Sequence, residues 1–497
     1  MHLIRVVLGV NVMIKGSQEA TGTPLGTRTG TDGTYSINVP SGLNTLVFSF
    51  IGFQTQEIDI ENRSVVNVVM VADMAMIETV VVVGYGTQRE RNITGSISAT
   101  SSEDFNRGAM LSPQQLIQGK VAGVNISQNS GKPGGSSTVL IRGGTSLTGS
   151  NEPLYVIDGV PISTSSASRQ VNINSGGNQT YFDQESVNPL SALNPNDIES
   201  ITILKDASAT AIYGSRGANG VIVVTTKTGR PGTLTTSYDT RFGFSSVAKQ
   251  LDVLSAGDFR AANQSLGLNM LDLGGNLNYQ DEIFRSAISQ THDISFSGGT
   301  SSTSYRASLG YGLQEGIIIA SNMENTNARL NINHSAIDDR LRFDLRLTAS
   351  QIQSQMAPTS NVVSGEAGTN VIWEAYRFNP TIPVFNQNGD FNHVSQFNVN
   401  PVSYSKQLED ELTARRVLGN LSTTFDIIDH MSVNMNLGYT YNTNARNAYI
   451  YRASPLGGGF GGMATSQQSN DWSKLMETTL RFARTFGGDH DVDLIAG

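Results

Sequence analysis

The chain has 497 residues, of which 38% are hydrophobic and 15% charged, with 51 glycines and no cysteine. This length exceeds what one hydrophobic core normally serves, so more than one domain is expected. The absence of cysteine excludes disulfides and thiolate metal sites, and a net charge of −9 without a Lys/Arg cluster argues against a nucleic-acid partner. No run of about 18 apolar residues occurs, so any membrane-spanning segment must consist of β-strands.

The N-terminal stretch Met1–Val12 is apolar like the core of a signal peptide. It lacks a small-residue cleavage site and runs directly into a strand pattern. We therefore expect a start that has lost its export signal, with a genuine short leader as the alternative.

Alternating apolar residues from Val10 to Val71 predict a small antiparallel β-sandwich. Asp32 and Gly33 lie between two alternating stretches, which is a strong hairpin signal. Asp32 and Glu57 could be considered as metal ligands. Because no ligand cluster surrounds them, a turn and a surface position are the expected roles.

The segment Ile77–Tyr85, IETVVVVGY, places four consecutive valines between an acidic residue and a glycine. High β-propensity and low charge mean that this segment, if exposed, should seek a strand partner. Addition to the sheet of another protein is the binding mode that suits it. An interior strand of the first or second domain is the alternative. The binding hypothesis concerns Glu78, Thr79, Val80, Val81, Val82, Val83 and Gly84.

The region from Ser112 to Lys227 predicts an α+β domain with a short helix that ends near Gly123. A second helix-compatible run of Ala, Ser and Thr covers Asp206–Ile212. The strands predicted from β-branched residues are Thr138–Arg142, Leu154–Ile157, Ile198–Leu204 and Val221–Thr226.

Three glycines, Gly214, Gly217 and Gly220, punctuate the path into the last of these strands. This spacing predicts positive φ or close approach to another surface. A nucleotide-binding loop is the alternative, but its glycines would follow a strand and open a helix, whereas these precede a strand.

Two charged residues of this domain lie next to apolar strands. Arg142 follows Ile141 and is costly to bury unpaired, so we expect it to meet a carboxylate within this domain or on a surrounding wall. Asp158 and Gly159 form the predicted turn between two strands. An aspartate bonded to its own backbone is the expected role there, rather than a catalytic group.

Beyond Gly229, alternating segments of roughly ten residues recur, joined by connections that are short and long in turn. This pattern is typical of an outer-membrane β-barrel, in which the tyrosines would suit interfacial girdles. Each predicted hairpin pairs two apolar series: Ile294 and Phe296 with Tyr305, Ala307, Leu309 and Tyr311; Leu330 and Ile332 with Leu341–Leu347; Val417–Phe425 with Val433–Tyr439; Leu480 and Phe482 with Val492 and Leu494. Tyr441 completes the predicted girdle.

About nine strands follow the second domain, an odd number that cannot close a bacterial barrel around a domain of this size. Plugged barrels need about 22 strands, which predicts a fragment that lacks the C-terminal half of its barrel. A soluble β-sandwich or solenoid is the alternative. The long connections are expected near Asp252–Gln290, Ser354–Ala414 and Asn442–Asp471.

Catalysis has little support in the sequence. None of the six histidines has metal-ligand spacing, and no G-x-S-x-G elbow occurs. The acidic pair Asp338 and Asp339 falls in a predicted turn. We therefore expect no enzyme, no metal and no cofactor.

Four motifs in order give the chain a family resemblance: ETVVVVGYGT at 78–87, IRGG at 141–144, LYVIDGVPI at 154–162, and LNPNDIESITILKDASATAIYGSRGANGVIVVTTK at 193–227. They resemble SusC/RagA-type TonB-linked outer-membrane transporters. The resemblance implies a mainly β chain and four parts. These are a carboxypeptidase regulatory-like β-sandwich with an incomplete first strand over 1–74, a TonB box and linker over 75–90, a plug over 91–228, and a partial barrel over 229–497.

The resemblance also implies what these parts do. The TonB box would be residues 78–84, bound by TonB with its inner-membrane energising complex. A SusD/RagB-like surface lipoprotein, outer-membrane lipid and a glycan or oligopeptide cargo would be the other partners. A surface adhesin that binds without transport competes with this hypothesis, and a signalling receptor is a third option. The plug motif would comprise Arg142, Gly143, Asp158, Gly159, Tyr213, Gly214, Gly217 and Gly220.

Overall fold

The computed structural model describes residues 9–15, 25–30, 32–50, 53, 55–61, 63–70, 80–83, 86–89, 97–106, 108, 112–144, 151–162, 190–206, 210–360, 369–395, 398–486 and 490–497. The chain divides into two compact units, and each is described by itself. The first comprises Met1–Val81 and Thr87–Ile93, and the second Val82–Gly86 and Thr94–Gly497.

The first unit is built on a four-stranded antiparallel sheet with the order β2-β1-β3-β4. The strands are β1 (Asn11–Ile14), β2 (Gly26–Arg28), β3 (Thr45–Ser49) and β4 (Gln56–Asp59). Alternate residues of β1 and β3 point to one face, where Val12, Ile14, Leu46 and Phe48 form a buried cluster. The alternation predicted from the sequence therefore marks the core of this unit.

The Asp32-Gly33 turn of the first unit is confirmed, but the segment after it is not a strand. Asp32 Oδ1 accepts from the backbone N–H of Thr34 at 3.1 Å, and Gly33 has a φ of 72°. Residues 34–40 have no ladder partner, yet Tyr35 and Ile37 pack on the buried cluster. The expected hairpin thus becomes a turn followed by an irregular covering segment.

The second unit contains a five-stranded sheet in the order β11-β10-β13-β12-β7 and a separate β8-β9 hairpin. Strands β12 and β13 have the predicted limits, and β10 pairs with β13 in parallel while its other neighbour is antiparallel. A 3₁₀ turn, η2 (Pro113–Ile117), replaces the first predicted helix, and η3 (Pro195–Asp197) precedes β12. In the second predicted run, Thr210 donates to the Asp206 carbonyl oxygen at 3.0 Å, which is the i to i−4 spacing of an α-helix, and η4 (Ala211–Gly217) follows. Residues 207–209 of that run lie outside the described residues. The strands are β7 (Ile97–Ser101), β8 (Val124–Gln128), β9 (Ser137–Ile141), β10 (Leu154–Ile157), β11 (Val160–Ile162), β12 (Ile198–Leu204) and β13 (Val221–Thr226).

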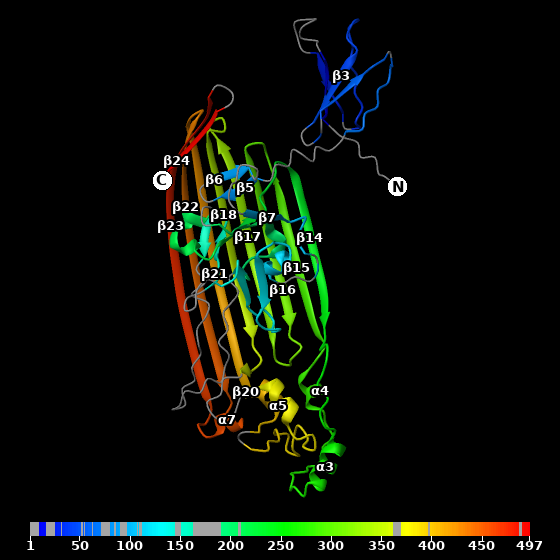
Figure 1. Ribbon diagram of the computed structural model, residues 1–497, viewed down its shortest axis with the longest axis vertical. Helices are drawn as coiled ribbons and strands as arrows, with labels where there is room; N and C mark the ends of the chain where they lie inside the picture. The colour runs from blue at the N-terminus through cyan, green and yellow to red at the C-terminus, as the bar shows by residue number, and fades with distance from the viewer. Residues whose placement is uncertain are drawn as a thin grey trace. The chain divides into compact units, whose positions relative to one another are not determined.

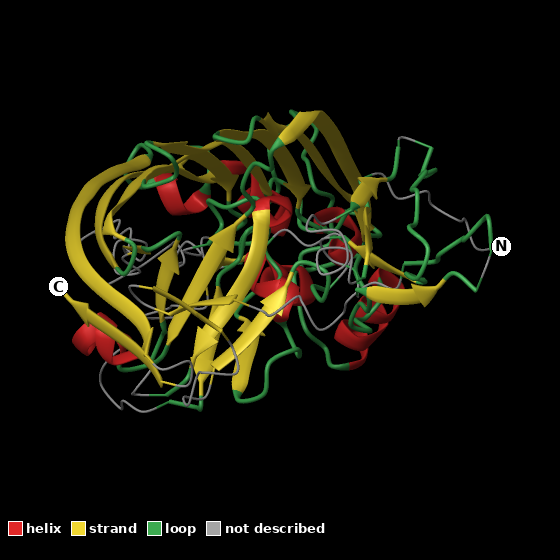
Figure 2. Ribbon diagram, turned by 90° about the horizontal axis from the view of Figure 1, so that it is seen from above, coloured by secondary structure: helices red, strands yellow, loops and turns green. Residues whose placement is uncertain are grey.

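A nine-stranded antiparallel sheet, hereafter the wall, follows with strands in sequence order. It curves around the five-stranded sheet (Figures 1 and 2). The predicted pairings are confirmed, since Phe296 lies opposite Ala307, Leu330 opposite Leu347, and Phe482 opposite Leu494. The strands are β14 (Gly232–Ser245), β15 (Ala287–Gly299), β16 (Thr303–Glu315), β17 (Asn322–Ala336), β18 (Leu341–Gln355), β21 (Leu408–Ile428), β22 (Met431–Ile450), β23 (Met463–Phe486) and β24 (His490–Ala496).

Three wall strands are about twice as long as the sequence suggested. Strands β21, β22 and β23 have 21, 20 and 24 residues, because the ladder continues through stretches that are polar on both faces. The stretch 442–471, expected as a loop, belongs mostly to β22 and β23. Hydrophobic alternation marked only the part of each strand with an apolar outer face.

The long connections gather at one end of the wall and form a packed substructure, hereafter the cap. Helices α4 (Tyr279–Ile283), α5 (Val371–Arg377) and α6 (Pro401–Gln407) contribute to its buried cluster with Phe378 and Ile382. Asn278, Asn370 and Asn400 cap these helices with their side chains. The remaining elements at this end are α3 (Ala256–Ser265), α7 (Pro455–Gly458), β19 (Thr359–Ser360) and β20 (Thr369–Asn370).

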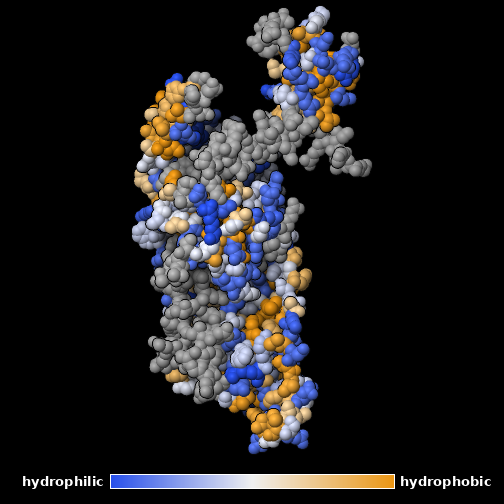
Figure 3. Space-filling view, in the orientation of Figure 1, coloured by the Kyte–Doolittle hydropathy of each residue, from blue (hydrophilic) through white to orange (hydrophobic). Residues whose placement is uncertain are grey.

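The outer face of the wall exposes apolar side chains. Further exposed leucines surround α3 at the cap end, where Figure 3 shows hydrophobic residues at the surface. The tyrosines proposed for a girdle, Tyr305, Tyr311, Tyr439 and Tyr441, are 37–42% exposed. Their role at a lipid interface stays a prediction. Among the described residues, no helix is long and apolar enough to cross a membrane.

Candidate functional site: the plug motif and its seat on the wall

The valine run forms strand β5 (Val80–Val83), which pairs with β6 (Gly86–Arg89) in a separate two-stranded sheet. The interior-strand alternative required this strand to join the four-stranded or the five-stranded sheet. It belongs to neither. Glu78, Thr79 and Gly84 lie outside the described residues. The backbone therefore has the extended conformation that strand addition needs, and the binding hypothesis stays a prediction.

The three glycines before β13 have the conformations that the sequence predicted. Gly214 and Gly220 have φ of 60° and 91°, in the region that favours glycine. At Gly217 a Cβ would lie 2.9 Å from the carbonyl oxygen of Thr210. The adjacent Tyr213 packs on the buried cluster of Val156, Leu204, Val221 and Val223.

Arg142 meets no carboxylate of a described residue, so the predicted ion pair stays a prediction. It lies in the turn after β9 with a φ of 57°, is exposed, and forms no ion pair with any described residue. Gly143 follows it with a φ of 86°. The turn carries the side chain away from the sheet, so the penalty for burying an unpaired guanidinium does not arise.

Asp158 carries a buried carboxylate, and the expectation that it bonds its own backbone is wrong. The turn itself exists, since Asp158 and Gly159 have φ of 48° and 86°. The carboxylate accepts from the Thr226 backbone N–H at 3.0 Å and forms an ion pair with Arg329 of β17. The two charged side chains are 1% and 3% exposed. Arg329 also donates to Thr348 at 2.8 Å, so the wall orients it.

A second ion pair, with a buried carboxylate and a partly buried arginine, joins the same two layers. Asp197, at the start of β12, accepts from Arg306 of β16 at 3.1 Å and from the Ser308 hydroxyl at 2.6 Å. Asn196 donates to Asp293 of β15 at 2.5 Å. These contacts come from Leu193–Asp197, the first five residues of the 193–227 motif, for which the sequence predicted no separate role.

Asparagine side chains of the wall also donate hydrogen bonds to the plug backbone. Asn331 donates to the Lys227 carbonyl oxygen at 2.5 Å, and Asn325 donates to that of Ser191 at 3.0 Å. Two contacts with the opposite part of the wall are apolar: Leu418 joins the buried cluster of the plug, and a Cβ at Gly438 would lie 3.1 Å from Val160. The contacts of the plug with β14–β17 are hereafter the plug seat.

The sequence signal for the plug seat is an arginine at an inward-facing position of a strand that otherwise carries Asn and Ser there. Arg306 and Arg329 both fit this pattern. It was missed because period-2 alternation identifies the face of a residue and not its partner. Burial also raises the pKa of Tyr155, inside the plug sheet, above its ordinary range.

Asp32 and Glu57 of the first unit have the turn and surface positions that the sequence predicted. Thr34 donates to Asp32 and holds the pKa of that carboxyl below its usual value, and Glu57 pairs with Lys15 on the surface. Among the described residues, no group of three or more His, Cys, Asp or Glu could hold a metal ion.

Two family models match successive parts of the chain. The TonB-dependent Receptor Plug Domain matches residues 89–221, and the CarboxypepD_reg-like domain matches residues 5–83. TonB-dependent receptor P3 of Formosa agariphila is 32% identical over 496 residues, covering 98% of this chain and 46% of that protein. TonB-dependent receptor SusC of Bacteroides thetaiotaomicron is 38% identical over 383 residues, covering 76% and 35%.

Among solved structures, the RagAB peptide importer in the 'open-open' state superposes with a TM-score of 0.68 at 23% identity. It covers 84% of this chain and 48% of that one, which shows the same fold. The chain spans about half the length of the relatives it matches, 46% of the Formosa protein for example.

Fold, plug and relatives define the class as the TonB-dependent receptors. Within that class the chain belongs to the SusC/RagA-type transporters, as its motifs predicted. This membership indicates an outer-membrane protein. The relatives are receptors and transporters rather than enzymes.

Proposed function

We propose that the protein imports a nutrient across the outer membrane, with TonB supplying the force that rearranges the plug. The observation that carries this proposal is the plug seat. A domain held against a curved wall by ion pairs and amide contacts blocks the interior, yet its polar contacts can exchange for water when the domain moves.

The coupling site of the proposed importer is the segment 78–84. Its central residues Val80–Val83 already have an extended backbone. A periplasmic TonB domain would add its own strand to this segment.

A surface lipoprotein of the SusD/RagB type is the proposed partner at the cap end, and a glycan or an oligopeptide is the proposed cargo. The relatives support this partner because one is named SusC and another is the RagAB peptide importer. The adhesin alternative has no feature of the described residues in its favour.

The test is capture of a peptide covering Ile77–Thr87 by the periplasmic domain of TonB. The double substitution Val81→Pro and Val83→Pro removes two backbone donors, so binding should be lost. A peptide with Thr87→Pro, outside β5, is the matched control and should bind normally. If the native peptide does not bind, the coupling proposal fails and the adhesin hypothesis moves forward.

A further inference from the structure

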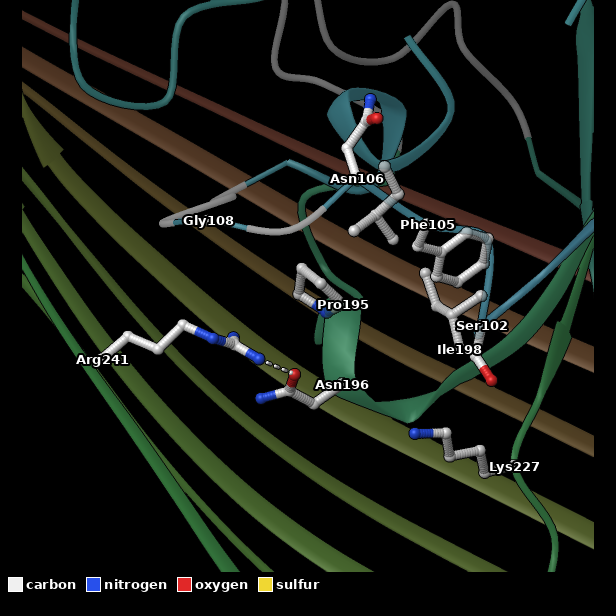
Figure 4. A pocket seen from close by; sticks show the side chains of 10 residues that line it. Ser102, Phe105, Asn106, Gly108, Pro195, Asn196, Ile198, Lys227 and Arg241 are labelled. Atoms are coloured by element: carbon white, nitrogen blue, oxygen red, sulfur yellow. Dashed lines mark hydrogen bonds between the residues drawn. The ribbon is translucent and has the colours of Figure 1, made fainter. Parts of the chain in front are cut away.

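A cavity of about 330 Å³ lies between the plug and the first wall strand (Figure 4). Its volume is at the lower end of the range for small-molecule pockets, which is roughly 300–1,000 Å³. Phe105, Leu116, Pro195 and Ile198 of the plug provide an apolar side. The polar lining consists of Ser102, Asn106, Asn196, Lys227 and Arg241.

Two cations enter this cavity from opposite sides. Figure 4 shows Lys227 and Arg241 directed toward the region of Asn196. Arg241 donates one hydrogen bond, to Asn196 Oδ1 at 2.6 Å, and a guanidinium has five N–H donors. Within the described ranges, the Lys227 ammonium forms neither a hydrogen bond nor an ion pair.

The backbone fixes where the Lys227 side chain starts. Its N–H donates to the Asp197 carbonyl oxygen at 2.8 Å, and its own carbonyl accepts from Asn331 of the wall at 2.5 Å. The ammonium is therefore presented by a residue held on both sides, which lowers the entropy lost when a ligand binds.

The nearby carboxylates accept their hydrogen bonds from other residues, and Asp293 also interacts electrostatically with Arg241. Asp197 is occupied by Arg306 and Ser308, and Asp293 by two plug asparagines. Lys227 is thus a cation beside an apolar surface with amide donors nearby. Such a site suits a single carboxylate carried on a compact carbon skeleton, because charge-assisted hydrogen bonds are the strong ones.

We propose that this cavity binds the carboxylate of a small solute between plug and wall, with Lys227 and Arg241 as its cationic contacts and Phe105 and Leu116 against its apolar part. A peptide C-terminus and an acidic sugar both offer this chemistry. The proposal concerns the resting protein and does not depend on TonB.

Titration calorimetry of the full chain in detergent at low salt tests the site with two probe pairs: N-acetylphenylalanine against its amide, and glucuronate against glucose. At least one acid should bind, about tenfold or more tighter than its neutral partner. The acid that binds identifies the source as peptide-like or sugar-like. If each acid binds no better than its neutral partner, the proposal is wrong.

Variants locate the binding. Lys227→Gln keeps both backbone bonds and should weaken acid binding about tenfold or more, whereas Lys227→Arg should retain most of it. Lys120→Gln removes one charge from an exposed plug lysine outside the cavity and is the matched control. Unchanged binding by Lys227→Gln, with a normal thermal unfolding curve, would overturn the assignment. Because TonB capture uses a separate peptide, failure of either proposal leaves the other standing.

Discussion

The plug seat and the cap are both buried interfaces of the second unit, but they are built from opposite chemistry. The plug seat joins Asp158 to Arg329 and Asp197 to Arg306, with amides between them. The cap buries an apolar cluster around Tyr279, with Ile382 and other side chains from several long connections. One interface is polar and spans two layers, whereas the other is a small hydrophobic core.

This difference indicates which part can move. A hydrogen bond to protein is worth only about 0.5–1.5 kcal/mol more than one to water, so a polar interface can be wetted at modest cost. An apolar cluster loses roughly 25 cal/mol for each Å² exposed. We therefore expect the plug to separate from the wall more readily than the cap unpacks.

The largest expected effect follows from leaving one buried charge of the plug seat unpaired. Arg329→Met leaves the Asp158 carboxylate buried without its cationic partner. The free energy of unfolding should fall by about 3–5 kcal/mol, and the hydrogen-exchange protection of β12 and β13 should fall with it. Combining this substitution with Asp158→Leu should restore most of the protection, because the charge is then absent.

The exposed pair of Arg342 and Asp426 is the matched control for that experiment, with side chains 44% and 32% exposed. Arg342→Met should cost less than about 1 kcal/mol. If Arg329→Met leaves plug protection at its native level, the ion pair does not hold the plug.

A substitution that creates a cavity in the cap should have the next largest effect. Ile382 is 0% exposed, and its carbonyl oxygen accepts from the Tyr279 hydroxyl at 2.8 Å. Ile382→Ala should cost about 2–5 kcal/mol and lower exchange protection of α4 and α5. The plug strands should be unaffected.

The matched control in that region is Leu268→Ala, because Leu268 is 57% exposed beside α3. It should stay within about 0.5 kcal/mol of the native protein. Equal loss of protection in the cap and plug would contradict independent behaviour of the two interfaces.

The smallest expected effect is a pH dependence confined to the cap. Burial lowers the pKa of His393 to about 4, and its Nδ1 accepts from the Asn400 backbone N–H at 3.2 Å. A histidine whose pKa is lower in the folded protein than in the unfolded chain contributes its full stabilisation of the fold only above the unfolded-state pKa. Cap protection should therefore fall as pH drops from about 6.5 toward 4.

Substituting this histidine with a neutral acceptor isolates its contribution. His393→Gln should flatten the decline in cap protection over that pH range. A decline of the same size in the variant would mean that another group is responsible.

The sequence predicted the strands with one apolar face and their neighbours. Alternation at Leu330 and Ile332 identified the hairpin with Leu345 and Leu347, because a side-chain period of two is a local property. The glycine spacing before β13 likewise predicted Gly214 and Gly220, since positive φ is a demand of the residue's own backbone.

Only the tertiary structure decided the polar contacts. Asp158 and Arg329 are 171 residues apart, and no local pattern links a turn aspartate to an inward arginine on a distant strand. The same holds for the cap, where individually polar connections bury a shared apolar cluster once the wall brings them together. Neighbouring residues set the backbone conformation and the face of a strand to which each side chain points. Partners in another layer meet only after the chain has folded.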